Sequence, residues 1–327
     1  MTLGNKISIE KDFEERAPWI GADLQTLRNF LLPQPRIETT SNSIKLPMSD
    51  GDILVASLNM SADLPKRPLI ILVHGLTGSE NSVNIISATN YLVQKSWRVL
   101  RLNLRGSIPT RPLAKGHYHA GKTEDLREAL NQLPHQLLNN GVILLGHSLG
   151  GNLILKFLGE GLKDDKILGG VAISSPLILR DTCAEMMKSR NFFYHRHILK
   201  AMKEEALAPG AQLSSAQIEL ITSAQSIYEF DHNFIAPLFG YQGADDYYFK
   251  NSSGRFLAGI NKPTLIIHAL NDPWIPPEVY LETQWDLYPT IQTKITKSGG
   301  HLGFHGKNNK IAWHNLATHD WLMQIFC

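Results

Sequence analysis

Strand and helix patterns alternate along most of this 327-residue sequence, which predicts an α/β protein with a mostly parallel central sheet. Three observations support this prediction. Short runs of aliphatic residues recur along the chain, helical patterns with apolar residues three and four positions apart separate them, and residues 176–262 contain no strand pattern. Continuous apolar runs are typical of parallel strands that are covered by helices on both faces.

The predicted elements can be placed along the chain beyond residue 40, and a short helix at 23–30 precedes them. Strands are expected at 43–48, 53–60, 69–73, 98–104, 142–145, 170–174, 264–268 and 290–296. Helices are expected at 82–94, 124–138, 149–158 and 311–325. The Asp50-Gly51 step between the first two strands is a hairpin signal.

The stretch 176–262 is predicted to contain helices at 179–189, 192–207 and 215–228. We expect it to form a helical cap inserted into a single domain that spans residues 1–327. Such a cap could act as a lid over a site or could only add helical packing, and the sequence favours neither. Five apolar residues in it are expected to pack onto the sheet, with a lipid-facing role as the alternative: Phe192, Phe193, Ile198, Leu199 and Met202.

The composition is that of a globular protein, with 43% hydrophobic residues, 19% charged residues and a formal net charge of +2. Its 32 Lys and Arg are scattered along the sequence, which argues against a nucleic-acid or anionic-membrane footprint. The chain has two cysteines, no apolar leader and no run long enough to cross a bilayer. We therefore expect a cytoplasmic protein without a transmembrane segment, and the sequence does not indicate its oligomeric state.

The pentapeptide Gly146-His147-Ser148-Leu149-Gly150 lies between a predicted strand and a predicted helix. This context distinguishes the nucleophile elbow of the α/β-hydrolase fold from an incidental Gly-x-Ser-x-Gly match. Gly146 and Gly150 lack the Cβ atoms that would clash in so tight a turn. The positive end of the following helix faces the site. The pattern therefore predicts Ser148 as a nucleophile.

A serine nucleophile needs a histidine base and a carboxylate that orients it, and in this fold they follow in the order Ser, Asp or Glu, His. Asp272 comes just after strand 264–268, and His301 lies in a Gly-flanked loop after the last strand. Both therefore fall where the active sites of open α/β sheets lie. Asp181 and His305 are rivals, but the first falls within a predicted helix and the second lies further along its loop.

The oxyanion of an acyl-transfer intermediate is held by two backbone N–H groups. We expect one from Leu149, which follows the nucleophile, and the other from Leu76, in the loop after strand 69–73. A phosphate-binding loop is rejected at this place, because neither a Gly-Lys-Ser/Thr ending nor Gly-x-Gly-x-x-Gly is present.

Two pairs of histidines raise the question of a metal site: His117, His119, His195 and His197. No cysteine or carboxylate accompanies them at ligand spacing, so they are interpreted as surface or cap residues. We expect neither a metal nor an organic cofactor.

Several segments carry a resemblance to a known family: Asp23-Leu24-Gln25-Thr26-Leu27, His74-Gly75-Leu76-Thr77-Gly78-Ser79, Asn103-Leu104-Arg105-Gly106, residues 118–126 and 228–234, Asn271-Asp272-Pro273 and residues 299–304. In these segments the chain resembles the YheT-like α/β-hydrolases, relatives of the abhydrolase-domain esterases and phospholipases of animals. Asp23 stands where the family has a histidine. The resemblance implies hydrolysis of carboxylic esters with short or medium acyl chains, and it supports the same triad.

The sequence thus predicts a serine carboxylester hydrolase that acts on a small-molecule or lipid ester through an acyl-enzyme on Ser148, with Asp272 and His301. A lipase, a phospholipase or an acyltransferase would use the same residues. A non-catalytic binding module on this fold is disfavoured, because no member of the triad is missing.

Overall fold

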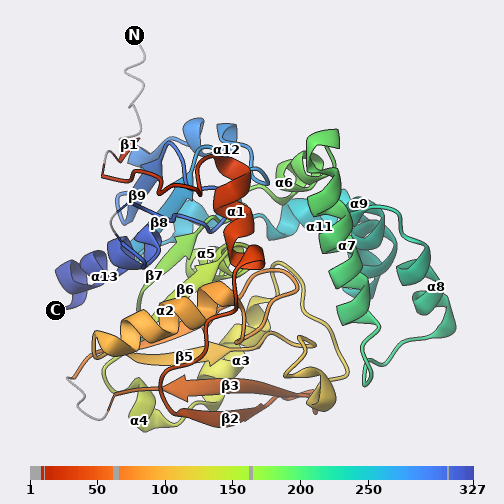
Figure 1. The fold of residues 1–327 in the computed structure, drawn as a ribbon. Coiled ribbons are helices and arrows are strands. Elements are labelled where there is room, and N and C mark those ends of the chain that lie inside the picture. Colours follow the sequence, from red (N-terminus) through yellow and green to blue (C-terminus); the bar gives the residue numbers. More distant parts are fainter. Residues whose placement is uncertain (1–8, 11, 62–65, 162–164, 308) are drawn as a thin grey trace.

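The computed structural model describes residues 9–10, 12–61, 66–161, 165–307 and 309–327, and it is built around one nine-stranded sheet (Figure 1). The strand order is β1-β9-β8-β7-β6-β4-β5-β3-β2. Neighbouring strands from β1 to β5 in this order are parallel, whereas β3 runs antiparallel to both β5 and β2. The strands are β1 (Ile9–Glu10), β2 (Ser41–Pro47), β3 (Ile53–Asn59), β4 (Leu69–Val73), β5 (Arg98–Leu102), β6 (Val142–His147), β7 (Ile167–Ile173), β8 (Thr264–Ala269) and β9 (Ile291–Thr296).

Successive side chains of each buried strand point to opposite faces of the sheet, so both faces are apolar, and helices cover both. In β4, Leu69, Ile71 and Val73 join a hydrophobic cluster that includes residues of two helices, α3 (Thr123–Gln132) and α5 (Leu149–Gly159). Ile70 and Leu72 join a second cluster with α2 (Val83–Gln94) and α13 (Trp313–Phe326). These clusters confirm the predicted α/β class.

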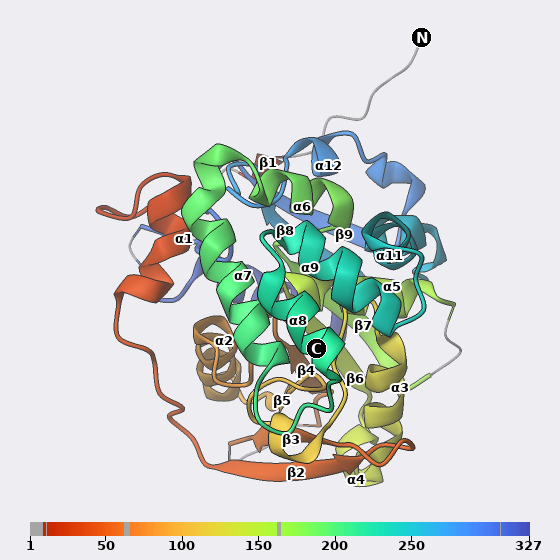
Figure 2. The same cartoon turned by 90° about the vertical axis from the view of Figure 1, so that its right-hand side faces the viewer.

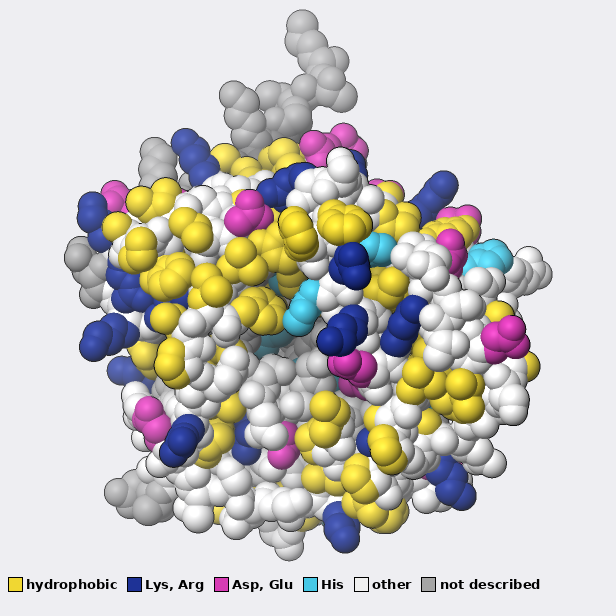
Figure 3. Space-filling view, turned by 45° about the vertical axis from the view of Figure 1, so that its right-hand side comes forward, with side chains coloured by type: hydrophobic (Ala, Val, Ile, Leu, Met, Phe, Trp, Pro, Cys, Tyr) yellow, Lys and Arg dark blue, Asp and Glu magenta, His cyan; other side chains and the backbone are white. Residues whose placement is uncertain are grey.

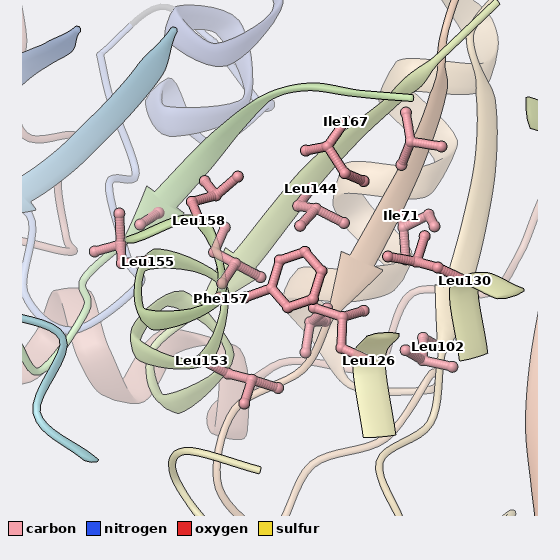
Figure 4. Packing of buried hydrophobic residues seen from close by; sticks show 14 of the residues in the cluster. Ile71, Leu102, Leu126, Leu130, Leu144, Leu153, Leu155, Phe157, Leu158 and Ile167 are labelled. Atoms are coloured by element: carbon pink, nitrogen blue, oxygen red, sulfur yellow. The ribbon is translucent and has the colours of Figure 1, made fainter. Parts of the chain in front are cut away.

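Phe157 of α5 is almost completely buried in the first cluster. In Figure 4 its ring points toward the space between Leu144 of β6 and Leu126 of α3. Large aromatic side chains contribute much of the hydrophobic free energy of a core. The packing of Phe157 therefore helps to hold α5, which begins directly after Ser148, against the sheet.

Residues 176–262 form helices and contain no strand, as predicted, and in Figure 2 most of these helices lie in front of the sheet. They are α6 (Leu179–Met186), η2 (Ser189–Asn191), α7 (Phe192–Ala206), α8 (Ser215–Ser223), α9 (Ile227–Phe230), η3 (Asp231–Ile235), α10 (Ala236–Leu238), α11 (Ala244–Asn251) and η4 (Ser253–Gly259). Ile198, Leu199 and Met202 pack in a hydrophobic cluster of these inserted helices, so the expectation that they pack onto the sheet is wrong.

Two predicted helices are each divided into two in the structure. The helix expected at 124–138 is interrupted, because Pro134 lacks the N–H that would continue it, and a separate α4 (His135–Leu138) follows. The helix expected to reach residue 228 ends at Ser223. A new helix, α9, begins after Ser226, whose side chain accepts a hydrogen bond from the Glu229 N–H.

The first 40 residues, which sequence patterns leave largely unassigned, contribute β1 and α1 (Ala22–Leu31). The helix predicted at 23–30 is confirmed. β1 has only two residues, too few to show a periodicity, and it pairs with β9. The remaining short helices are η1 (Arg111–Leu113), α12 (Glu278–Leu281) and η5 (Trp285–Leu287).

Arg105 follows β5, in one of the segments shared with the family, and it is buried and anchors its neighbours through ion pairs. Its guanidinium donates to Asp125 of α3 at 2.8 Å and to Asp52 of the β2–β3 hairpin at 2.6 Å. Burial alone would lower the pKa of Arg105, but the charge of Asp125 and the hydrogen bonds that Arg105 donates to Asp125, Asp52 and Asp50 outweigh it and raise the pKa. The ion pairs therefore join three segments that are distant in sequence.

We expect Arg105→Met to lower the free energy of unfolding by about 3–5 kcal/mol, because it leaves the buried Asp52 and Asp125 without their cation. Urea unfolding followed by circular dichroism measures this. Arg180→Met is the matched control, since the Arg180–Asp245 pair is exposed and such pairs contribute about 0–1 kcal/mol. Equal losses for the two variants would contradict the anchoring role.

Candidate active site

Ser148 lies in a strained turn between β6 and α5, with φ 52° and ψ −119°. Backbone conformations of this kind are costly and persist only where the surrounding structure enforces them. A Cβ atom on Gly146 would overlap the backbone of Gly150, and one on Gly150 would overlap the carbonyl of Val73. Steric crowding therefore requires glycine at both positions of the motif, as the sequence predicts.

Three predicted residues are joined by hydrogen bonds in the structure. The Nε2 atom of His301 lies 3.0 Å from the Oγ of Ser148, and its Nδ1 lies 2.7 Å from the Oδ2 of Asp272. The Asp272 side chain is fully buried, and its Oδ1 accepts the N–H groups of Trp274 and Ile275. A carboxylate at Nδ1 selects the tautomer in which Nε2 is free to accept the serine proton.

The fold brings these residues together because β6, β8 and β9 all end at the same edge of the sheet. The two rivals lie elsewhere. Asp181 is exposed on α6, and the buried His305 donates its backbone N–H to the side chain of Gln25. Neither lines the cavity that contains Ser148.

The loop after β4 passes directly over the serine. A Cβ atom on Gly75 would lie 3.1 Å from the Cβ of Ser148. The N–H groups of Leu76 and Leu149 have no acceptor among the described residues, and both leucines line the cavity. Burial lowers the pKa of His74 to about 4, and the neutral ring accepts the Leu104 N–H and donates to the Gly75 carbonyl.

A hydrogen-bonded relay from the inserted helices supports this loop. Thr77 has a φ of 55°, and its N–H donates to the hydroxyl oxygen of Tyr118 at 2.8 Å. Tyr118 in turn donates to Glu205 of α7 at 2.9 Å, and desolvation raises the pKa of Glu205 to about 7. Sequence reasoning missed Glu205, because no local pattern relates three residues so far apart along the chain.

The loop that carries His301 is held by α1. Thr26 accepts the backbone N–H of His301 at 2.8 Å, and Gln25 bonds both the N–H and the carbonyl of His305. On the opposite side, the ring of Trp274 lies 4.1 Å from that of His301. The family segment around Gln25 thus has a positioning role that its residue types alone do not reveal.

Ser148 and His301 line a cavity of about 360 Å³ between the sheet edge and the inserted helices. Its wall is largely apolar and includes Leu76, Leu149, Leu179, Met186, Ile198 and Met202. Phe30 of α1 and His197 of α7 also line it, with their rings 5.8 Å apart. Figure 3 shows the surface hollowed beside a histidine, with hydrophobic side chains gathered on one side.

The interpretation of His117 and His119 as surface or cap residues is wrong, because the inserted helices cover both. Nδ1 of His117 lies 3.1 Å from the Arg111 guanidinium, and the His119 ring packs 4.5 Å from Phe239. His195 and His197 lie on α7, the first half-buried and the second exposed. Within the described ranges, no three His, Cys, Asp or Glu residues form a group that could hold a metal ion.

Comparison with known proteins agrees with this geometry. A sequence profile described as alpha/beta hydrolase fold matches residues 68–307. The chain belongs to this family. It is similar to "Putative esterase YheT" of Escherichia coli, with 29% identity over 98% of this chain and 96% of the relative. It is also similar to human "Phospholipase ABHD3", with 25% identity over 88% of this chain and 71% of the relative.

Among solved structures, this α/β-hydrolase resembles the Pyrococcus furiosus esterase Pf2001. The TM-score is 0.58 with 15% sequence identity, and the match covers 90% of this chain and 97% of the esterase. An identity this low shows a shared fold. No helix in the described part of the chain is long and apolar enough to cross a membrane.

Buried histidines make the stability of the fold depend on pH. Burial lowers the pKa of six of them to about 3 or 4: His74, His117, His119, His147, His268 and His305. The stability that they contribute is present above the unfolded pKa of about 6.5 and is lost as the pH falls toward 4. Asp231 and Glu205, with pKa values raised to about 7, act oppositely but are fewer.

We therefore expect the thermal midpoint to fall as the pH is lowered from 7 to about 4.5, as measured by circular dichroism. His268→Phe should reduce this slope, because the replacement cannot be protonated and can keep the stacking on Tyr280. The exposed His135→Gln is the control and should leave the slope unchanged. A midpoint that rises on acidification would contradict the prediction.

Proposed function

We propose that this α/β-hydrolase is a serine carboxylester hydrolase that acts on short- to medium-chain acyl esters through an acyl-enzyme on Ser148. The proposal rests on the unbroken hydrogen-bonded series from Ser148 through His301 to Asp272, which opens into an apolar cavity. The printed names of the relatives, an esterase and a phospholipase, support an ester as the class of substrate.

In the acylation step, the Oγ of Ser148 attacks the ester carbonyl carbon while the Nε2 of His301 takes the hydroxyl proton. The carbonyl π electrons move to oxygen, and the Leu76 and Leu149 N–H groups stabilise the resulting oxyanion. When the intermediate collapses, the bond to the alcohol oxygen breaks, and His301 gives its proton to the departing alcohol.

Deacylation repeats these steps with water. His301 takes a proton from the water as its oxygen attacks the acyl carbon, and the proton then passes to the Oγ of Ser148 as the carboxylic acid leaves. Asp272 keeps its hydrogen bond to Nδ1 throughout and stabilises the imidazolium, and two backbone N–H groups hold its carboxylate in place. The N-terminus of α5 adds positive potential beside the serine.

We further propose that residues 176–262 act as a cap that selects the acyl group, since Leu179, Met186 and Met202 contribute to the cavity wall. A lipid ester is the second candidate substrate. The observation that favours it is the set of hydrophobic residues exposed on α1 and α7, among them Phe30 and Phe193, because both helices also contribute to the cavity wall.

Ser148→Ala is expected to lower the kcat for p-nitrophenyl butyrate by at least about 10⁴-fold, and Asp272→Asn by about 10⁴-fold through the wrong histidine tautomer. Steady-state hydrolysis and labelling by a fluorophosphonate probe measure the two effects. Ser43→Ala, on the exposed surface of β2, is the control and should hydrolyse and label normally. Turnover by Ser148→Ala equal to that of the unchanged protein would refute the mechanism.

The apolar cavity predicts a dependence on acyl length. Each buried methylene contributes about 0.8 kcal/mol, so kcat/KM should rise roughly fourfold per methylene from acetate until the cavity is filled. Met202→Phe, which adds bulk to the wall, should shift the optimum to a shorter chain. A series of p-nitrophenyl esters tests both, and a kcat/KM that does not vary with length would contradict a cavity that binds the acyl chain.

A further inference from the structure

Helix α1 turns polar side chains toward the protein and apolar side chains toward solvent, which is the opposite of a normal surface helix. It buries the polar residues Gln25 and Thr26 against the His301 loop and directs Leu24 and Leu31 outward, with 42% and 62% of their surface exposed. Surface helices normally turn their apolar face to the core. Because the polar face of α1 is occupied by the loop, its apolar face is left to solvent.

The N-terminal end of α7 continues this apolar surface. Phe193 is 82% exposed and Phe192 is 50% exposed, so neither packs onto the sheet as the sequence suggested. Figures 1 and 2 show α1 and α7 side by side. Arg190 and Tyr194 both donate hydrogen bonds to Asp23 of α1, which joins the two helices at one end.

Together, residues 19–36 and 185–205 form a surface that we call the pocket rim. Eight of the nineteen large hydrophobic side chains exposed in the described part of the chain belong to it, although it comprises only about an eighth of the sequence. Asn29, Phe30 and His197 belong both to this rim and to the cavity wall. The exposed apolar surface therefore borders the cavity that contains Ser148. Exposed apolar patches of this kind mark interaction sites.

Positive charge accompanies the exposed apolar residues. The rim holds seven Lys and Arg against four carboxylates, an excess of three, whereas the excess over the whole chain is two. Three of the carboxylates, Asp23, Glu185 and Glu204, form ion pairs within the rim with cations whose side chains are exposed, and such surface pairs are weak. Arg196 and Lys200 lie on the outward face of α7, and Figure 3 shows Lys and Arg side chains beside the hollow.

We propose that the pocket rim docks on the surface of an anionic lipid bilayer and that the cavity takes its ester from that surface. Exposed Phe and Leu side chains enter the headgroup–acyl boundary, while Arg and Lys contact the anionic headgroups. Docking itself requires only the rim, but the use of a lipid ester rests on the proposed function.

The rim suits a lipid surface better than a second copy of the chain. Two copies meeting through this face would bring together two surfaces that each carry excess positive charge. Such a dimer would also cover Phe30 and His197, which line the cavity, in both copies. A bilayer presents negative charge and apolar chains at once and can supply the substrate through the same entrance.

The test is flotation of the purified full-length protein with vesicles of phosphatidylcholine containing about 30 mol % phosphatidylglycerol, compared with pure phosphatidylcholine. We expect tighter binding to the anionic vesicles. Leu31→Ser/Phe193→Ser should weaken binding about tenfold, since both side chains are exposed and neither lines the cavity. Phe249→Ser/Leu287→Ser is the matched control, because these residues are 61% and 64% exposed outside the rim.

Charge reversal tests the contribution of the Lys and Arg side chains to docking. Arg196→Glu/Lys200→Glu should weaken binding to anionic vesicles about tenfold, whereas Lys45→Glu/Lys66→Glu, exposed outside the rim, should have little effect. Ser148→Ala should float like the unchanged protein, which separates a failure of docking from a failure of the chemistry. Absence of vesicle binding, equal losses in the control variants, or self-association through the rim without vesicle binding would overturn the proposal.

Discussion

The turn at Ser148 constrains most of the structure around it. A serine with φ 52° and ψ −119° can be kept there only if β6 and α5 are both held firmly, because an isolated chain would relax the turn. β6 is central in the sheet between β4 and β7, and α5 is held by Phe157 in the core. The close approach of Gly150 to the carbonyl of Val73 then sets the loop after β4 directly over Ser148.

The other side of the site depends on contacts between the two ends of the described chain. His301 follows the last strand, yet its backbone N–H is held by Thr26 of α1. This contact uses the polar face of α1, and it is the reason that Leu24 and Leu31 of the same helix face solvent. The packing of α1 therefore links the position of His301, the proposed general base, to the apolar pocket rim.

The inserted helices contact both halves of the site through α7. Glu205 reaches Thr77 in the loop after β4 through Tyr118, while Tyr194 packs edge-on against Trp274, which lies on the His301 ring. Desolvated hydrogen bonds are strong only when each partner is in place, so these contacts make the loop geometry sensitive to the position of α7. The insertion thus does more than fill space beside the sheet.

Local patterns in the sequence by themselves determined the α/β class, the strands beyond residue 40 and the order of Ser148, Asp272 and His301, because strand and elbow signals depend on residues that are neighbours in sequence. The apolar pattern predicted one helix over 124–138, although Pro134 in the same sequence interrupts it. Only the tertiary structure decided that Glu205 supports Thr77 and that His117 and His119 are buried. It also brings α1 against α7, so that Lys and Arg residues that are scattered along the sequence share one surface. These features depend on contacts between residues far apart in sequence, and the energy of such a contact is set by which surfaces the fold brings together.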